Sequence, residues 1–145
     1  MNCNSGTYSL NLLNDTSSCP FECGNLNILI NCKDIMINEN QRNLAVMGEN
    51  GTRIITFDIP RFINEKDLSK MTLNINLLNN NDEKYTIKLE YTNEDIKENY
   101  INAHWNIDTT VTSVAGKLLV EIEAIDTNFD WKTYQNYFII NESLN

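Results

Sequence analysis

Apolar and polar residues alternate along most of the chain from residue 26 onward. Because successive side chains of a β-strand point to opposite faces, this two-residue period predicts strands with one buried and one exposed face. Turn-forming residues separate the runs, as at 49–51, 79–82 and 115–116. The expected inward positions are Leu26, Ile28 and Ile30; Ile35 and Ile37; Ile55, Phe57 and Ile59; Leu73, Ile75 and Leu77; Tyr85, Ile87, Leu89 and Tyr91; Leu118, Val120 and Ile122; and a last strand over 137–140.

Only two segments have a helical signature. Residues 64–70 suit a single turn, and residues 93–100 begin with Glu94 and Asp95, whose negative charges favour a helix N-terminus. About seven to nine strands with so little helix predict an all-β chain folded as a single antiparallel β-sandwich.

The first 25 residues differ in composition from the rest of the chain, since they are rich in Ser, Thr, Asn and Gly and hold three of the four cysteines. We therefore divide the chain into an N-terminal extended arm, residues 1–25, and a β-sandwich domain, residues 26–145. The arm has few apolar residues with which to offset an ordering entropy of about 1–2 kcal/mol per residue. We expect it to dock on a partner, with Tyr8, Leu10, Leu12 and Leu13 in contact as a strand added at a sheet edge. The alternative is an arm that folds back on its own sandwich, pinned by the cysteines.

The charge balance narrows the choice of partner. The chain carries 20 Asp and Glu against 11 Lys and Arg, a formal net charge of -9. This sign opposes the attraction to phosphate on which nucleic-acid binding depends, and it equally opposes adhesion to acidic lipid surfaces. No apolar run approaches the roughly 18–20 residues of a membrane helix, and no secretory signal is visible. We expect a protein partner, with no nucleic acid and no membrane.

The four cysteines, Cys3, Cys19, Cys23 and Cys32, permit three readings. They can form two disulfides in any of three pairings, bind zinc, or remain reduced, as expected for a protein made in a bacterial cytoplasm. The run Asp126-Thr127-Asn128-Phe129-Asp130 opens like a calcium loop, but Trp131 stands where that motif needs glycine. We interpret it as a turn between strands and expect no metal and no cofactor.

The inventory for catalysis is small. His104, the chain's one histidine, lies beside Trp105 in an expected strand, and no serine or cysteine occupies a recognisable nucleophile motif. Glu121 and Glu123 alternate along a strand, which is typical of a solvated face. The sequence therefore predicts that the protein is not an enzyme.

One run of residues forms a sequence motif that the overall composition does not explain. Arg53–Phe62 ends in Ile59-Pro60-Arg61-Phe62, and Asp67-Leu68-Ser69 follows shortly after. This pairing resembles a β-sandwich domain of phage tail and baseplate proteins, similar to the N-terminal domain of upper baseplate proteins of phages of Gram-positive bacteria. The resemblance extends over residues 34–142 through three later pieces, namely His104-Trp105-Asn106-Ile107, the run Val111–Gly116 with its turn, and Trp131-Lys132-Thr133.

These motifs also make sense as determinants of the fold. Pro60 cannot donate to a β-ladder and so should end its strand, and Arg61 can form charge-assisted bonds. Asp67 belongs to the same structural motif. Phe57, Trp105 and Trp131 are large enough to anchor a core, and Gly116 suits a turn.

The resemblance implies a non-enzymatic structural protein of a virion, located in a tail or baseplate. It would be made in the host bacterial cytoplasm and act through assembly with other virion proteins, in several copies or as a homo-oligomer. A capsid decoration or head-fibre base protein is the alternative location. A carbohydrate-binding sandwich is the alternative from another class, but the exposed aromatics it needs are missing if Tyr85 and Tyr91 share a core face with Ile87 and Leu89.

Overall fold

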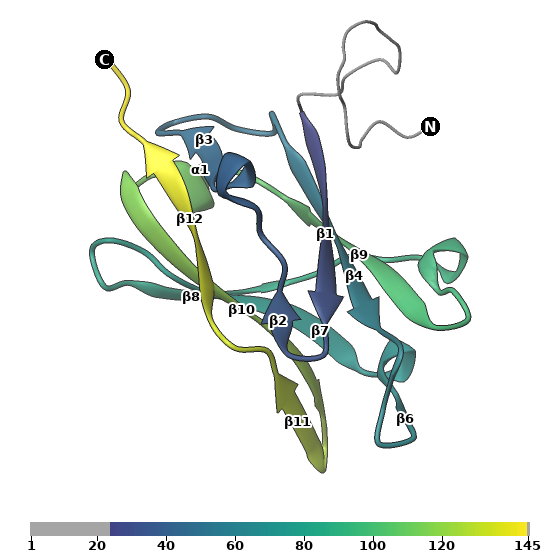
Figure 1. Ribbon diagram of the computed structural model, residues 1–145. Helices are drawn as coiled ribbons and strands as arrows, with labels where there is room; N and C mark the ends of the chain where they lie inside the picture. Colours follow the sequence, from purple (N-terminus) through teal and green to yellow (C-terminus); the bar gives the residue numbers. More distant parts are fainter. Residues whose placement is uncertain (1–23, 145) are drawn as a thin grey trace, which may run out of the picture.

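The computed structural model describes residues 24–144 and shows an all-β fold of two packed sheets (Figure 1). The four-stranded sheet, called here the β4 sheet, has the order β2-β1-β4-β9. The six-stranded sheet, called the β10 sheet, has the order β3-β12-β10-β7-β8, with β11 also paired to β10. The strands of the β4 sheet are β1 (Asn25–Asn31), β2 (Asp34–Ile35), β4 (Ile54–Pro60) and β9 (Tyr100–Asn106). Those of the β10 sheet are β3 (Asn43–Val46), β7 (Thr72–Leu78), β8 (Lys84–Lys88), β10 (Gly116–Asp126), β11 (Phe129–Lys132) and β12 (Asn136–Asn141).

The expected all-β architecture is confirmed, and the structure adds two parallel ladders to the antiparallel ones. β1 pairs with β4 in parallel, and β3 pairs with β12 in parallel. The first arises because the chain leaves the β4 sheet after β2, forms β3 in the β10 sheet, and returns to run alongside β1 in the same direction. Alternation within each strand gives no information on such crossings, so the sequence pattern alone could not show them.

Short elements connect the strands. A two-stranded hairpin, β5 (Phe62–Ile63) with β6 (Lys66–Asp67), precedes the 3-10 turn η2 (Leu68–Lys70). Two further 3-10 turns are η1 (Glu39–Gln41) and η3 (Asn93–Asp95), and a single helical turn forms α1 (Thr109–Thr112). The helical segments expected at 64–70 and 93–100 are thus shorter than predicted. Among residues 24–144, no helix is long and apolar enough to span a lipid bilayer.

The core lies between the two sheets, and three aromatic rings join its layers. The rings of Phe57 on β4 and Trp105 on β9 stack with centroids 6.3 Å apart, and Trp105 reaches Phe138 on β12 of the opposite sheet at 6.2 Å. All three side chains are fully buried. Trp131 on β11 is also buried, below the ammonium of Lys33, which lies 5.5 Å from the ring centroid.

The chain from Lys84 to Tyr91 begins as β8 in the β10 sheet and then contacts the β4 sheet, where Glu90 pairs with His104. Its inward residues Tyr85 and Ile87 pack against the core, Leu89 is buried and Tyr91 packs beside it, so the interpretation of this face as core is confirmed. β8 ends at Lys88, three residues before Tyr91, where the predicted alternation ends, because Glu90 pairs instead with His104 of β9.

Candidate functional site

The corner after β4 is held by a bidentate ion pair. β4 ends at Pro60, and the Arg61 guanidinium donates to both carboxylate oxygens of Asp67, at 3.1 and 3.0 Å. Its remaining Nη1 donates to the backbone carbonyl of Lys97 at 3.0 Å. The hydrogen bonds from Arg61, with those from Ser69, hold the pKa of the Asp67 carboxyl well below its usual range. These residues fasten the fold, as expected for a structural motif.

Gly116, at the start of β10, has a φ of 116°, which side chains other than that of glycine rarely tolerate. A Cβ placed there would lie 2.7 Å from the side chain of Asn80 in the β7–β8 loop. The glycine therefore permits both the turn and the close approach of this loop.

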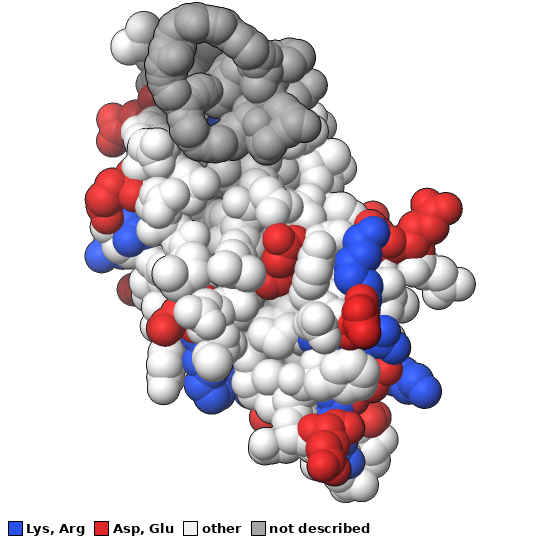
Figure 2. Space-filling view, turned by 45° about the vertical axis from the view of Figure 1, so that its right-hand side comes forward, with Lys and Arg blue, Asp and Glu red and all other residues white. Residues whose placement is uncertain are grey.

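The outer face of the β4 sheet is the first of two candidate sites. Figure 2 turns this side of the molecule forward and shows a largely uncharged surface that is interrupted by acidic side chains near its middle, with further charged side chains along its margins. Leu29 on β1 is 54% exposed and Tyr100 on β9 is 42% exposed, and Ile54 on β4 is also exposed. Phe62, just beyond the end of β4, is 49% exposed. Exposed apolar residues mark a site of protein contact where they gather on one face, and Leu29, Ile54 and Tyr100 lie on three neighbouring strands of the same face.

A row of polar side chains crosses the same face, and its members form hydrogen bonds with one another. Asp58 on β4 accepts one hydrogen bond from the amide of Asn27 on β1, at 2.9 Å, and another from the amide of Asn102 on β9, at 2.5 Å. The two amides lie on the strands that flank β4, so the carboxylate is bridged from both sides. Sequence reasoning missed this row because the partners are 31 and 44 residues apart along the chain.

His104 forms a second polar chain on this face. Its Nδ1 lies 2.8 Å from the Thr56 hydroxyl, and its Nε2 lies 3.2 Å from an Asp95 carboxylate oxygen. When the imidazole is neutral, Nε2–H donates to Asp95 and Nδ1 accepts from the Thr56 hydroxyl. The backbone N–H of Thr92 donates to the other Asp95 oxygen, and this bond, followed by the contact with His104, lowers the pKa of Asp95 against an opposing effect of burial.

The trio of Thr56, His104 and Asp95 has the residue types of a hydrolytic triad but not its setting. Thr56 lies in the middle of β4, which is paired with β1 on one side and β9 on the other. The backbone N–H groups of β4 are therefore directed into the two ladders and are not available to stabilise an oxyanion above the sheet. The contact between Asp95 and His104 connects η3 to β9, and this structural role is the one that the geometry supports.

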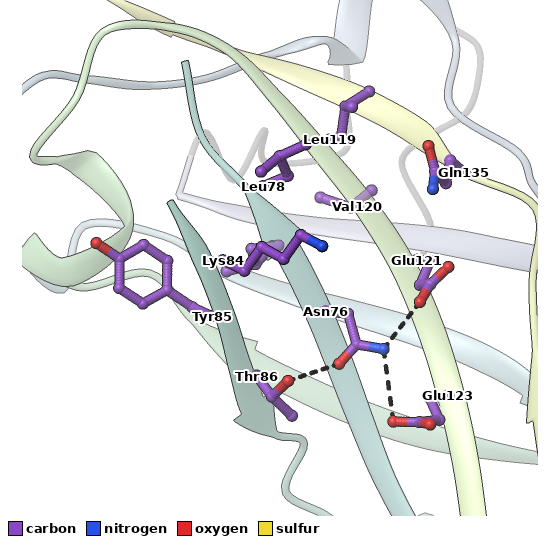
Figure 3. Close-up of a pocket in the computed structure, with 11 residues that line it drawn as sticks. Asn76, Leu78, Lys84, Tyr85, Thr86, Leu119, Val120, Glu121, Glu123 and Gln135 are labelled. Carbon is purple, nitrogen blue, oxygen red and sulfur yellow. Dashed lines mark hydrogen bonds between the residues drawn. The ribbon is translucent and has the colours of Figure 1, made fainter. Parts of the chain in front are cut away.

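The second candidate site is a hollow of about 480 Å³ on the outer face of the β10 sheet. Its lining comes mainly from β7, β8 and β10, with Gln135 from the loop before β12 (Figure 3). Figure 3 shows Lys84 reaching across β7 toward β10, and Tyr85 turned away from the other labelled side chains. The lining residues are Asn76, Leu77, Leu78, Lys84, Tyr85, Thr86, Leu119, Val120, Glu121, Glu123 and Gln135.

The two glutamates of this hollow correct the expectation of a plain solvated face. Glu121 is half-buried and Glu123 is buried, although both point outward from β10. The amide of Asn76 donates to Glu121 at 2.9 Å and to Glu123 at 3.4 Å. Lys132 on the neighbouring strand β11 covers Glu123 at 3.2 Å, which explains how a carboxylate on an outer face becomes buried.

The sequence resembling a calcium loop is the turn between β10 and β11. Its ends pair directly, Asp126 with Phe129, and Asp126 accepts a hydrogen bond from the backbone N–H of Thr127. Asp130 forms an ion pair with Lys132 at 2.8 Å, which holds the pKa of Asp130 below its usual value. Within residues 24–144, no group of three or more His, Cys, Asp or Glu side chains is placed to hold a metal ion.

Of the four cysteines, Cys32 lies within the described residues. Cys32 is exposed in the β1–β2 turn, with a φ of 57°. Cys3, Cys19 and Cys23 lie outside the described residues, as do the expected contact residues Tyr8, Leu10, Leu12 and Leu13. The three alternatives for the cysteines, and the two for the arm, stay open.

No family model fits the chain, and no curated protein is significantly similar to it in sequence. The interpretation of the site therefore depends on the chain's own residues and on the motifs described above.

Proposed function

We propose that the protein is a non-enzymatic structural component of a phage or phage-like particle, which acts by protein–protein assembly through the outer face of its β4 sheet. The partner on this face is a neighbouring subunit of the particle, and a second copy of this chain is the first partner to test. A tail or baseplate location follows from the resemblance of the Pro60–Ser69 region; a capsid surface location is the alternative.

The observation that carries the proposal is the combination of exposed apolar side chains with polar groups that already satisfy one another. Leu29, Ile54 and Tyr100 offer apolar area whose burial is worth about 25 cal/mol per Å². Covering a charge is costly, and the two amide hydrogen bonds that Asp58 already accepts lower this cost. The face can therefore be removed from water at a lower polar cost than an unbonded carboxylate would impose.

The charge distribution supports a contact with another acidic subunit. A net charge of -9 opposes self-association when the charges face one another across the contact. On this face many of the charged side chains lie at the margins, where solvent and salt screen their repulsion (Figure 2). The carboxylate of Asp58, on the central strand, is bonded by two amides.

The corner at Arg61 supports the resemblance on physical grounds. The three motif residues Pro60, Arg61 and Asp67 are brought together and fix the end of the β4 sheet next to its exposed face. A rigid corner beside an apolar face is what an assembly module needs, because subunits that hold their shape lose less entropy on docking.

The location is tested on particles produced by the bacterial host. Antibody labelling of purified particles, with mass spectrometry of their proteins, should find this chain at a fixed position. A label at the tail end supports the baseplate location, and a label over the head supports the decoration alternative. Absence of the chain from purified particles contradicts the proposal.

The surface is tested with Leu29→Asp and Tyr100→Asp, which place charges on the exposed face. Both variants should remain folded, because each side chain points outward, yet fail to enter particles. Lys88→Asp, on the opposite sheet, is the matched control and should be incorporated normally. Incorporation of both face variants at the wild-type level would show that this face is not the contact.

A further inference from the structure

We propose that the hollow on the outer face of the β10 sheet is a binding site for a neutral, hydroxyl-rich ligand of the sugar class. It lies on the side of the sandwich opposite the assembly face, so this inference does not depend on the proposed assembly function.

The size and floor of the hollow suit a small ligand. Its volume of about 480 Å³ falls in the range of about 300–1,000 Å³ typical of small-molecule sites. Leu78 on β7 and Leu119 on β10 are paired directly across the ladder and both point outward. They form an aliphatic patch that takes the place of the exposed aromatic rings expected of a carbohydrate-binding sandwich, and the C–H face of a sugar ring can lie against it.

The polar side chains around this patch include both hydrogen-bond donors and hydrogen-bond acceptors. Within residues 24–144, the Lys84 ammonium and the Gln135 amide have no side-chain hydrogen-bond partner, and both line the hollow. Glu121 uses its Oε2 to accept from Asn76, and its Oε1 accepts no hydrogen bond from the described residues. A hydroxyl group both donates and accepts, so a sugar can use all three positions.

The walls of the hollow are held in place before any ligand arrives. The Asn76 side chain accepts from the Thr86 hydroxyl at 2.8 Å and donates to both glutamates. Glu123 is in turn held by Lys132. Groups fixed in this way on adjacent strands lose little freedom when they bind a ligand.

The charges of the hollow favour a neutral ligand. The charged groups that line the hollow are the carboxylates of Glu121 and Glu123 and the ammonium of Lys84, while Lys132, outside the lining, pairs with both Glu123 and Asp130. A strongly anionic ligand would be repelled by the carboxylates and a strongly cationic ligand by Lys84, so charge gives neither a clear advantage over a neutral ligand.

An extended peptide fits this face less well than a sugar. Peptides usually add to a sheet by backbone hydrogen bonds at an open edge. β7 lies between β10 and β8, and β10 lies between β7 and the strands β11 and β12, so both are interior strands. The third lining strand, β8, is the edge strand of this sheet, but the floor of the hollow between β7 and β10 offers side chains only, and these can recognise hydroxyl groups.

The experiment is a ¹H–¹⁵N NMR titration of the full 145-residue chain with glucose, galactose, mannose, rhamnose and N-acetylglucosamine. At least one sugar should give saturable shift changes at the backbone amides of Asn76, Lys84, Leu119, Glu121 and Gln135, and leave those of Thr56 and Asn102 on the opposite sheet unchanged. Glucuronate and a tri-lysine peptide serve as the charged comparisons and should bind more weakly.

Two variants test the assignment. Lys84→Met and Glu121→Gln should each weaken binding about tenfold, as expected when a hydrogen bond to a charged group is removed. Lys88→Met is the matched control, since Lys88 lies on the same strand and face but does not line the hollow. Should either variant lose its dispersed spectrum, Gln135→Ala, which changes a loop residue, takes its place.

Four results would overturn the proposal: no saturable change with any of the five sugars, changes located away from the hollow, unchanged affinity in the variants, or tighter binding of the tri-lysine peptide. The last would assign the hollow to a basic peptide instead.

Discussion

The guanidinium of Arg61 holds both carboxylate oxygens of Asp67, at 3.1 and 3.0 Å, across the turn of the β5–β6 hairpin. The same carboxylate accepts hydrogen bonds from the backbone N–H and the hydroxyl of Ser69, at 3.0 and 2.7 Å. Since Arg61 also binds the carbonyl of Lys97, one ion pair connects the hairpin, the η2 turn and the segment leading into β9.

We predict that Arg61→Lys lowers the melting temperature although it keeps the charge. Lysine is a single point donor and cannot replace the two parallel bonds to Asp67 together with the bond to Lys97. Differential scanning calorimetry measures the loss. Lys66→Ala, at an exposed position in the same hairpin, should leave the melting temperature unchanged. Equal melting of Arg61→Lys and wild type would show that the pairing is not structural.

The Asp67 pair also predicts a pH dependence. The pKa of Asp67 is held well below its usual range, chiefly by Arg61. A carboxyl group with a lowered folded-state pKa stabilises the fold above its unfolded-state pKa, about 4, and this stabilisation is lost as the pH falls. The difference in unfolding free energy between wild type and Asp67→Asn should therefore be largest at neutral pH and shrink in acid. Urea unfolding at several pH values measures it, and a difference that stays constant into acid would contradict the assignment.

Trp105 gives the sharpest prediction about the core. Trp105→Ala should lower the free energy of unfolding by about 3–5 kcal/mol, because it removes the ring that joins Phe57 to Phe138. The indole Nε1 of Trp105 is buried with no hydrogen-bond partner in the described part of the chain. Both Trp105→Ala and Trp105→Phe remove this unpaired donor, but phenylalanine keeps an aromatic ring in the core and leaves a smaller cavity, so Trp105→Phe should cost clearly less than Trp105→Ala. Chemical unfolding of both variants tests the order, and an equal cost would contradict it.

Alternation predicted the strands well because burial on one face is a local property of each run. Phe57 and Ile59 alternate with Thr56 and Asp58 within β4, and the structure places them on opposite faces as expected. Which strands become neighbours depends on how the chain crosses between the sheets. The alternation of apolar and polar residues in β1 and β4 gives no sign that the two strands pair in parallel. The four-residue strand β3 was missed because Leu44 and Ala45 are both buried, which breaks the two-residue period.

The candidate sites were harder to predict, because their partners come from distant positions. Arg61 and Asp67 are six residues apart and were found as a motif, whereas the groups that hold Glu121 and Asp58 are more than thirty residues away. Tyr85 and Tyr91, the aromatic residues of the segment after residue 84, lie on its core face. The hollow lies on its other face, among Lys84 and Thr86, where sequence alternation indicates only solvent.

Gly116 should not tolerate alanine. Its φ of 116° is strained for any side chain, and a Cβ there would lie 2.7 Å from Asn80. We expect Gly116→Ala to destabilise the fold by more than about 1 kcal/mol. Gly48 has a φ of 93° but open space around it, so Gly48→Ala measures the backbone strain without the clash. Equal losses in the two variants, measured by urea unfolding, would show that the Asn80 loop moves aside.

The last prediction concerns the carboxylate of Asp95, which joins η3 to β9. Its Oδ2 accepts from the backbone N–H of Thr92 at 2.9 Å, and its Oδ1 lies 3.2 Å from His104 Nε2. The Thr92 bond is the largest cause of the lowered pKa of Asp95, ahead of His104, and burial acts in the opposite direction. His104→Gln should therefore raise the pKa of Asp95 only part of the way to its ordinary value.

An NMR titration of the Asp95 side-chain carboxyl carbon measures this shift in wild type, His104→Gln and Thr56→Val. Thr56→Val is the matched control, because it removes the other hydrogen bond of the imidazole and leaves the contact between His104 and Asp95 in place. It should leave the pKa of Asp95 nearly unchanged. Since a lowered pKa stabilises the fold above the unfolded-state value and that gain is lost as the pH falls, the cost of His104→Gln should be visible near neutral pH and fade in acid. A full return of the pKa in His104→Gln would make the histidine the main cause, and no change at all would mean that the contact does not form in solution.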